Sequence, residues 1–181
     1  YLLISYGLYT QGLVPPHIAA GVNLNFWPVG GLLRRGGAFY IRRSFAGQKL
    51  YSAVFRSYLD VILGRGYPVE FFPEGGRSRT GRLLPPKKGM LAMTVESFLA
   101  QPARKVALVP VYVGYDKLVE GASYVKELRG AAKQSESAGG LLKATRIFKS
   151  SYGSPHVAFG EPIALEDCLS HIEPEWRSKL Q

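Results

Sequence analysis

The sequence predicts an α/β fold in which a mainly parallel central sheet is flanked by helices. Short runs of β-branched and aromatic residues alternate along the chain with longer segments of helical periodicity. This alternation continues over 181 residues, a length that suits one domain with a sizeable core. In such a sheet, ligands bind beyond the carboxyl ends of the strands, so the loops after the expected strands are the candidate site.

The expected elements follow one another in order along the chain. The clearest helix covers residues 49–63, and its apolar side chains recur at helical spacing on one face. That face is expected to consist of Leu50, Val54, Tyr58, Leu59, Ile62 and Leu63. Other helices are expected at residues 1–13, 26–35, 88–100 and 141–149, residues 118–140 are expected to form a helix and then a loop, and a helix or tail is expected from 166 onward. Strands are expected at residues 16–20, 38–41, 69–72 and 156–159.

The run at residues 106–115 is almost continuously apolar and rich in β-branched side chains. Such a run favours a central strand that is covered on both faces. Pro110 interrupts it, and proline lacks the N–H group that a strand ladder needs. We therefore expect a central strand with a bulge or break at Pro110.

The charge balance points to an anionic partner. Lys and Arg number 23 against 13 Asp and Glu, a net charge of +10, which suits nucleic acid, an acidic membrane surface or a phosphorylated substrate. Residues 1–33 contain no charged side chain, which indicates either a buried segment or partial insertion at a membrane face through Phe26 and Trp27. With only Cys168 and three scattered histidines, neither an internal disulfide nor a metal site is expected.

Two adjacent arginines, Arg42 and Arg43, follow the expected strand at residues 38–41. The arginine side chain presents a planar fork of donors that fits phosphate or carboxylate. Neighbouring residues on an extended backbone point to opposite faces, so at most one of the two is expected to face a site unless the backbone turns there. On this segment alone, a solvated basic turn remains an alternative.

A carboxylate, two glycines and two spaced arginines follow the expected strand at residues 69–72. The segment reads Glu74-Gly75-Gly76-Arg77-Ser78-Arg79. Glycines let backbone N–H groups approach an anion closely. Arg77 and Arg79 share a face in extended geometry, so together they could clamp one phosphate. The pattern predicts a phosphate site, and the alternative is a charged loop in solvent.

The histidines do not supply an obvious general base. An imidazole base is usually oriented by a carboxylate, and a His-x4-Asp spacing would provide one. Neither His17 nor His171 has a carboxylate five residues on, and His156 has only Glu161, in a strand-and-turn context. We therefore expect none of the three histidines to be a catalytic base.

Taken together, three segments resemble the motifs of the glycerolipid acyltransferase family in their order and spacing. They are residues 37–43, 72–81 and 109–115. Residues 12–21, 23–28 and 126–131 are similar in particular to the branch of the family that acylates glycerol 3-phosphate. The resemblance runs from end to end, with small departures such as Tyr40, where Phe is usual.

The resemblance implies transfer of a fatty acyl group from acyl-carrier protein or coenzyme A to the 1-hydroxyl of glycerol 3-phosphate. The product would be lysophosphatidic acid, made in the first step of phospholipid synthesis. No bound cofactor and no nucleic acid are implied. The implied location is the membrane surface, on the cytoplasmic face of the bacterial inner membrane, as a peripheral protein.

Two alternatives remain. One is a related acyltransferase that uses lysophosphatidic acid or dihydroxyacetone phosphate. The other is a basic RNA- or membrane-surface-binding module without catalysis. The clearest basic clusters flank two expected strand ends, which favours an enzyme over such a module.

The resemblance also assigns roles. The family's His-x4-Asp motif directly precedes a segment like residues 1–6, so residues 1–181 are expected to be a partial catalytic domain that is inactive alone. The upstream His would take the hydroxyl proton, and Glu74 would support it by binding a glycerol hydroxyl or bracing the arginines. Arg43, Arg77 and Arg79 would hold the phosphate, with Arg42 as a further candidate. The expected substrate-binding set is Phe39, Ile41, Arg42, Arg43, Glu74, Gly75, Gly76, Arg77, Ser78, Arg79 and Pro110, with Phe39, Ile41 and Pro110 shaping the pocket.

Overall fold

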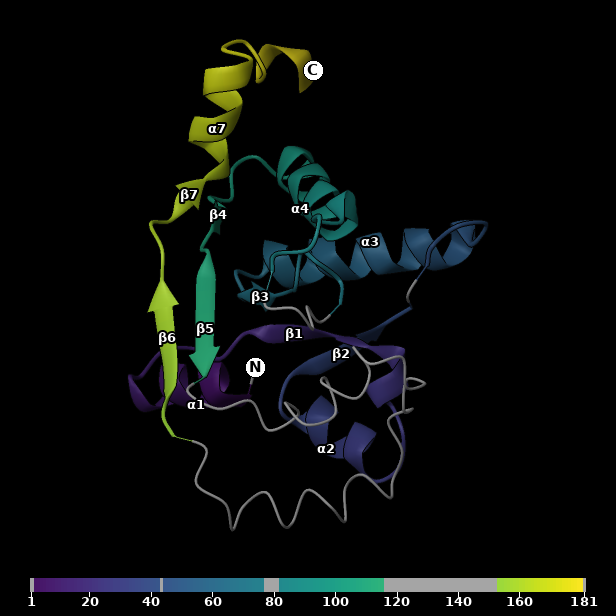
Figure 1. Cartoon of the computed structure of the whole chain (residues 1–181). Coiled ribbons are helices and arrows are strands. Elements are labelled where there is room, and N and C mark those ends of the chain that lie inside the picture. The colour runs from purple at the N-terminus through teal and green to yellow at the C-terminus, as the bar shows by residue number, and fades with distance from the viewer. Residues whose placement is uncertain (1, 43, 77–81, 116–152, 181) are drawn as a thin grey trace. The chain divides into compact units, whose positions relative to one another are not determined.

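The computed structural model describes residues 2–42, 44–76, 82–115 and 153–180, which are coloured in Figure 1. The chain divides into two compact units. The first contains Tyr1–Gly76, Pro85–Pro110 and Glu161–Gln181, and the second contains Arg77–Leu84 and Val111–Gly160. The helices expected at residues 118–140 and 141–149 lie outside the described residues.

The first unit is built on a three-stranded parallel sheet, which confirms the predicted α/β class. The strands β1 (His17–Gly21), β2 (Ala38–Ile41) and β3 (Val69–Glu70) are ordered β2-β1-β3. Ile18 and Gly21 of β1 stand opposite Ala38 and Ile41 of β2, while Ile18 also stands opposite Glu70 of β3. The central strand is covered on both faces, since Ile18, Ala19 and Ala20 are all buried.

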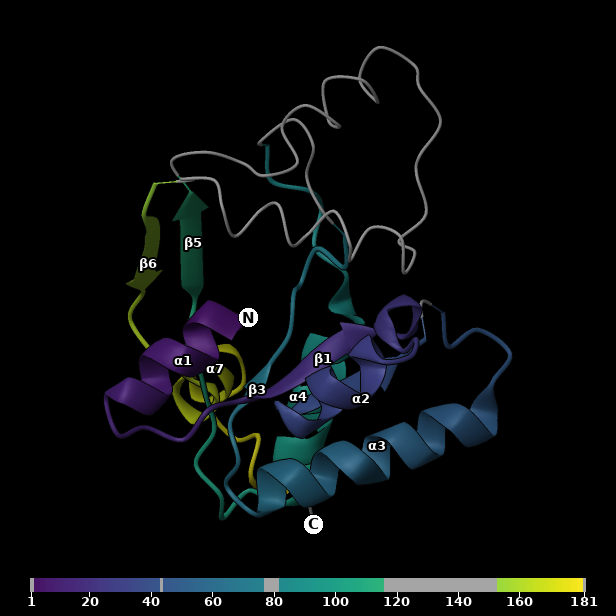
Figure 2. The same cartoon turned by 90° about the horizontal axis from the view of Figure 1, so that it is seen from below.

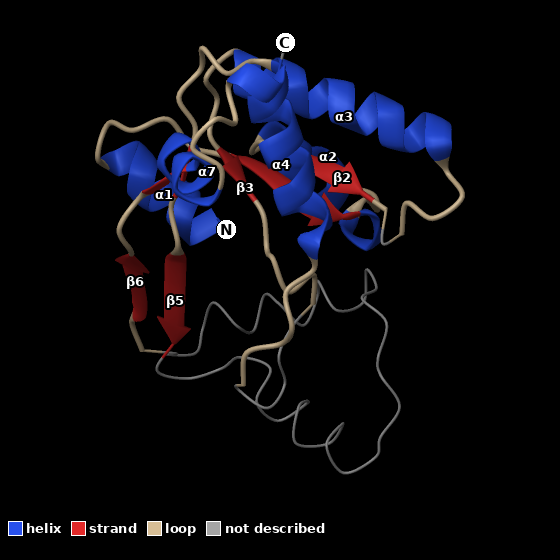
Figure 3. Cartoon of the chain, turned by 90° about the horizontal axis from the view of Figure 1, so that it is seen from above, coloured by secondary structure: helices blue, strands red, loops and turns tan. Residues whose placement is uncertain are grey.

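Helices cover the two faces of this sheet (Figures 1, 2 and 3). On one face, α2 (Val29–Arg35) packs Leu33 against Ala20 and Ala38, and the Tyr40 hydroxyl donates a hydrogen bond of 2.8 Å to the Gly30 carbonyl. On the other face, Phe39 meets the rings of α3 (Lys49–Gly64). Tyr40 and Phe39 contact different helices because successive side chains along β2 point to opposite faces of the sheet.

Helix α3 begins where the sequence predicts, but its buried face matches the expected one only in part. Phe55, Leu59 and Ile62 are buried, whereas Leu50 is 79% and Val54 60% exposed. The helix carries two neighbouring apolar stripes, and periodicity alone cannot rank them. Phe55 decides between them because its ring lies against Phe39 and Phe45, so the stripe that contains it faces the sheet. The expected face, which omitted Phe55, was therefore wrong in part.

The prediction of one central strand at residues 106–115 is also wrong. The run forms β4 (Ala107–Leu108), which pairs antiparallel with β7 (Ile163–Ala164), and β5 (Val111–Tyr115), which pairs antiparallel with β6 (Pro155–Phe159). The expected break does occur at Pro110. Because proline has no N–H to donate, the strand ladder of β4 ends there, and β5 can pair with a different strand. Strand β5 is largely exposed, with Tyr112 at 70%, rather than covered on both faces.

A second apolar cluster joins α4 (Lys88–Ala100) to the end of the chain. It consists of Phe98, Leu165 and Trp176, and the rings of Phe98 and Trp176 lie 5.7 Å apart between centroids. Trp176 donates a hydrogen bond through Nε1 to Ser170 in α7 (Leu165–Ile172). The remaining elements are α1 (Leu2–Thr10) and the short 3₁₀ helices Val22–Leu24 and Ser178–Leu180. Among the described residues, no helix is long and apolar enough to cross a bilayer.

Candidate functional site

The carboxyl ends of three parallel strands lie at one edge of the sheet. The last residue of β2, Ile41, stands opposite Gly21, the last residue of β1. Strand β3 ends at Glu70 opposite Ile18, so the residues after Glu70 continue toward the level of Gly21. The two segments singled out in the sequence, after β2 and after β3, therefore begin at the same edge of the sheet, on either side of β1.

Arg42 directly follows β2 and turns toward the start of α3. Its guanidinium donates through Nη1 to the Gln48 side-chain oxygen and lies over the Tyr51 ring, 4.7 Å from the centroid. Its backbone N–H donates to the Tyr51 hydroxyl at 3.1 Å. Phe39 and Ile41, which were expected to shape the pocket, are half-buried, and Phe39 packs on α3.

The loop after β3 contains a glycine that its backbone requires. Gly75 has φ +59, in the left-handed region that favours glycine, and its N–H donates to the Phe72 carbonyl at 3.0 Å. A Cβ at Gly75 would lie 2.9 Å from Cδ of Lys87, so that side chain already occupies the space. Glu74 beside it is half-buried, and Gly76 is exposed.

Lys87 is the residue that sequence reasoning undervalued. In the sequence it belongs to a basic run of five Lys and Arg residues from Arg77 to Lys88, and nothing sets it apart from the other four. The structure ties it to the Glu74–Gly76 loop: its N–H donates to the Pro73 carbonyl at 2.7 Å, and its side chain lies against Gly75. The approach depends on how the Glu74–Gly76 loop packs against the residue before α4, a contact between two segments that local sequence does not reveal.

The other expected site residues fall into two groups. Pro110 is exposed and separates β4 from β5. Arg43, Arg77, Ser78 and Arg79 lie outside the described residues, so their assignment stays a prediction. The structure thus describes the ends of β2 and β3 and the Glu74–Gly76 loop. The predicted phosphate ligands follow these segments in the sequence.

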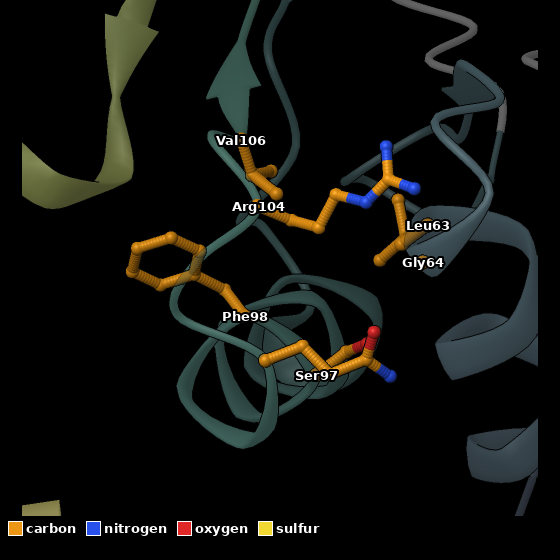
Figure 4. A pocket seen from close by; sticks show the side chains of 7 residues that line it. Leu63, Gly64, Ser97, Phe98, Arg104 and Val106 are labelled. Atoms are coloured by element: carbon orange, nitrogen blue, oxygen red, sulfur yellow. The ribbon is translucent and has the colours of Figure 1, made fainter.

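Two cavities differ sharply in what they could hold. An open cleft of about 510 Å³ lies beside the turn after β2 and is lined by Arg42, Gly47, Gln48, Lys49, Leu50, Tyr51 and Val54. Its volume is in the range of small-molecule sites. The cavity in Figure 4, between the ends of α3 and α4, holds only about 10 Å³, roughly room for one water. Of these two cavities in the described part of the chain, the cleft next to Arg42 is the one with room for a small molecule.

The histidines lie in separate elements. His17 begins β1 and meets the Tyr67 ring edge-on at 5.3 Å between centroids. His171 is in the last turn of α7, and His156 is in β6 of the second unit. That none of them serves as a general base stays a prediction.

Glu70 is a buried carboxylate at the end of β3. Both carboxylate oxygens are buried without a hydrogen-bond partner among the described residues. Burial raises the pKa of the Glu70 carboxyl above its usual value near 4.5, because the charged form loses its hydration. This group therefore opposes folding at neutral pH, where the unfolded chain would ionise it freely.

We expect Glu70→Gln to strengthen the sheet at pH 7 and to have little effect near pH 4. Because the pKa of Glu70 is higher in the folded chain than in the unfolded chain, the folded chain binds more protons than the unfolded chain at pH values between these two. The free energy of unfolding therefore falls as pH rises through that interval. Amide hydrogen exchange of β1, compared between variant and wild type at each pH, measures the difference. Glu161→Gln, at an exposed position, is the control. A protection difference that does not change with pH would contradict the expectation.

Comparison with known proteins gives the family. The profile described as Acyltransferase matches residues 1–114, which is more than half of the chain. The chain belongs to the acyltransferase family. A second profile, described as the glycerol-3-phosphate acyltransferase C-terminal region, matches residues 124–181. The two profiles follow one another along the chain and together cover most of it.

Individual members of the family are similar over the whole chain. A glycerol-3-phosphate acyltransferase of Pasteurella multocida is 58% identical over 181 residues, all of this chain and 22% of the relative. Proteins of the same name from Shewanella oneidensis and Shewanella loihica are each 60% identical over 180 residues, 99% of this chain and 22% of each relative. The chain thus spans about a fifth of the length of these relatives. The resemblance seen in the sequence is confirmed.

Proposed function

We propose that the protein carrying this chain transfers a fatty acyl group to the 1-hydroxyl of glycerol 3-phosphate, giving lysophosphatidic acid. The observation that carries the proposal is the 58–60% identity, over essentially the whole chain, with proteins named glycerol-3-phosphate acyltransferase. The two segments expected to hold the acceptor begin at the same edge of the sheet, which supports it. This is the region where ligands bind in α/β sheets.

In the proposed reaction the acceptor hydroxyl attacks the thioester carbonyl of the acyl donor. The new C–O bond forms, the C–S bond breaks, the hydroxyl proton passes to a base, and the donor leaves as a thiol. By the family resemblance, the base and its orienting carboxylate belong to a His-x4-Asp motif upstream of Tyr1, and residues 1–181 are part of that catalytic domain. No covalent enzyme intermediate is needed.

Residues of this chain bind and orient the acceptor in the proposal. Arg43, Arg77 and Arg79 hold the phosphate dianion through charge-assisted hydrogen bonds, with Arg42 as a further candidate. Glu74 accepts a hydrogen bond from a glycerol hydroxyl or braces the arginines, and Gly75 gives the loop the left-handed turn it requires. Holding the alcohol beside the base lowers the barrier by positioning.

The acyl donor is acyl-carrier protein or coenzyme A carrying the acyl group, and it acts as a co-substrate. No further cofactor and no nucleic acid take part in the proposed reaction. The family membership supports a donor of this kind, because acyl transfer requires an activated acyl group.

We further propose that α2 contacts the cytoplasmic surface of the bacterial inner membrane, with the protein bound peripherally. Trp27, just before the helix, is 89% exposed, and Leu32 within it is 71% exposed. Arg34 and Arg35 are exposed in the last turn of the same helix. Aromatic and aliphatic side chains next to cations suit the interface of a membrane with anionic lipids. Phe26, the other aromatic residue predicted there, is half-buried.

A panel of acceptors tests the proposed reaction. The full-length protein is expected to acylate glycerol 3-phosphate at least tenfold faster than lysophosphatidic acid or dihydroxyacetone phosphate at equal concentration, a preference of roughly 1.4 kcal/mol in transition-state binding. Radiolabelled products separated by chromatography give the three rates and the acylated position. A preference for either other acceptor would replace the proposed substrate, and acylation at the 2-hydroxyl would exclude the proposed product.

A further inference from the structure

Tyr51, in the first turn of α3, makes two different contacts with Arg42. Its hydroxyl accepts the Arg42 backbone N–H at 3.1 Å, and its ring lies beneath the Arg42 guanidinium at 4.7 Å. One contact fixes the main chain directly after β2, and the other fixes the side chain. Tyr51 thus contacts both the main chain and the side chain of the first of the two adjacent arginines.

Tyr51 is itself held by aromatic packing. Its ring lies 5.1 Å from that of Phe45 and 6.2 Å from that of Phe55, and Phe45 and Phe55 meet at 5.3 Å. Phe55 is buried against the sheet through Phe39. Aromatic contacts at these distances are favourable beyond their buried area. The Tyr51 ring is therefore connected to the sheet by Phe55 and to the turn by Phe45.

The Arg42 guanidinium has a second partner in Gln48, the residue before α3, which accepts a hydrogen bond from Nη1. With the cation–π contact, this gives the side chain a defined place at the edge of the 510 Å³ cleft, which Gln48 and Tyr51 also line. An arginine already ordered in this way loses less conformational entropy when an anion binds.

We propose that Tyr51 is a positioning residue that holds Arg42 and the turn after β2 in the form that binds the acceptor's phosphate. The inference rests on the proposed function, because glycerol 3-phosphate is the ligand whose binding Tyr51 supports. Tyr51 acts through Arg42 and the main chain and takes no part in the acyl transfer itself. Its loss therefore changes KM for the acceptor and leaves kcat nearly unchanged.

Two substitutions in the full-length protein separate the contacts. Tyr51→Phe keeps the ring under Arg42 and removes the hydroxyl that accepts the Arg42 N–H, whereas Tyr51→Leu removes both contacts. We expect KM for glycerol 3-phosphate to rise about two- to threefold in Tyr51→Phe, which loses one weak contact. In Tyr51→Leu, which loses two weak contacts, we expect KM to rise about five- to tenfold. In both variants kcat stays within about twofold of wild type.

Tyr58→Leu is the matched control. Tyr58 lies on the same helix and meets Phe39 at 5.3 Å, so its loss also removes an aromatic contact with β2 but leaves the turn after β2 in place. We expect its KM to equal that of wild type. An equal rise in KM for Tyr58→Leu and Tyr51→Leu would show that loosened packing is the cause, and would overturn the inference.

Amide hydrogen exchange of the peptide that covers residues 42–48, without substrate, gives a readout independent of turnover. Tyr51→Phe is expected to speed exchange at the Arg42 amide, because that N–H loses its acceptor. If KM is unchanged in both Tyr51 variants while Arg77→Ala raises it, the inference is wrong and the proposed function stands. If wild-type protein does not acylate glycerol 3-phosphate, the proposed function fails and this inference fails with it.

Discussion

Arg77→Ala in the full-length protein is expected to lower kcat/KM for glycerol 3-phosphate more than tenfold. Arg77 directly follows the pair Gly75-Gly76, in the loop after β3. Loss of one charge-assisted contact to a phosphate costs roughly 1.4 kcal/mol or more, which is a factor of ten in binding. Initial rates over a range of acceptor concentrations, at saturating acyl donor, measure the effect.

Two further variants make this result specific. Arg82→Ala removes another cation from the same basic run but lies beyond the Gly75–Arg79 segment, and it should stay within about twofold of wild type. Arg77→Lys keeps the charge but lacks the planar fork of donors. Its kcat/KM for glycerol 3-phosphate should therefore lie between those of wild type and Arg77→Ala. An unchanged Michaelis constant and rate in Arg77→Ala would exclude Arg77 from the phosphate clamp.

Replacement of Trp27 and Leu32 together by serine is expected to reduce binding of the full-length protein to anionic vesicles at least tenfold. The two side chains are 89% and 71% exposed, so their removal does not open the core. Full burial of a large apolar side chain in a lipid interface contributes about 1.5–3 kcal/mol. Partial burial of two such side chains therefore still raises the affinity for vesicles by more than about tenfold. Flotation with vesicles of phosphatidylglycerol and phosphatidylethanolamine measures the bound fraction.

Ile172→Ser is the matched control, because Ile172 is also 79% exposed but lies at the end of α7. Its binding should equal that of wild type. High salt should weaken wild-type binding, since Arg34 and Arg35 contribute through exposed charges. If the double serine variant binds vesicles as tightly as wild type, α2 is not the membrane-contacting surface.

Much of the fold could be predicted because local patterns determine it. Strand β2 and helix α4 occupy the predicted residues 38–41 and 88–100, where a short apolar run follows two glycines and a helical pattern follows two prolines. The parallel sheet followed from the alternation of strands and helices. These features depend on neighbours in sequence, so sequence alone could indicate them.

Partners distant in sequence could not be predicted. The run at residues 106–115 has the composition of a buried parallel strand, yet its two halves pair antiparallel with Ile163–Ala164 and Pro155–Phe159. The buried face of α3 depends on which side of it meets Phe39. The approach of Lys87 to Gly75 depends on how the Glu74–Gly76 loop packs against the residue before α4. Each outcome is decided by tertiary contacts that no local pattern encodes.

The order of pairing has a consequence for synthesis of the chain on the ribosome. All three strands of the parallel sheet are complete once Glu70 has been made, so this sheet can form early. Strand β5 ends at Tyr115, and its antiparallel partner β6 is complete only at Phe159, 44 residues later. At roughly 5–20 residues per second the delay is about 2–9 s. During that interval an apolar, aromatic strand is without its partner, which exposes this stretch of the nascent chain to aggregation.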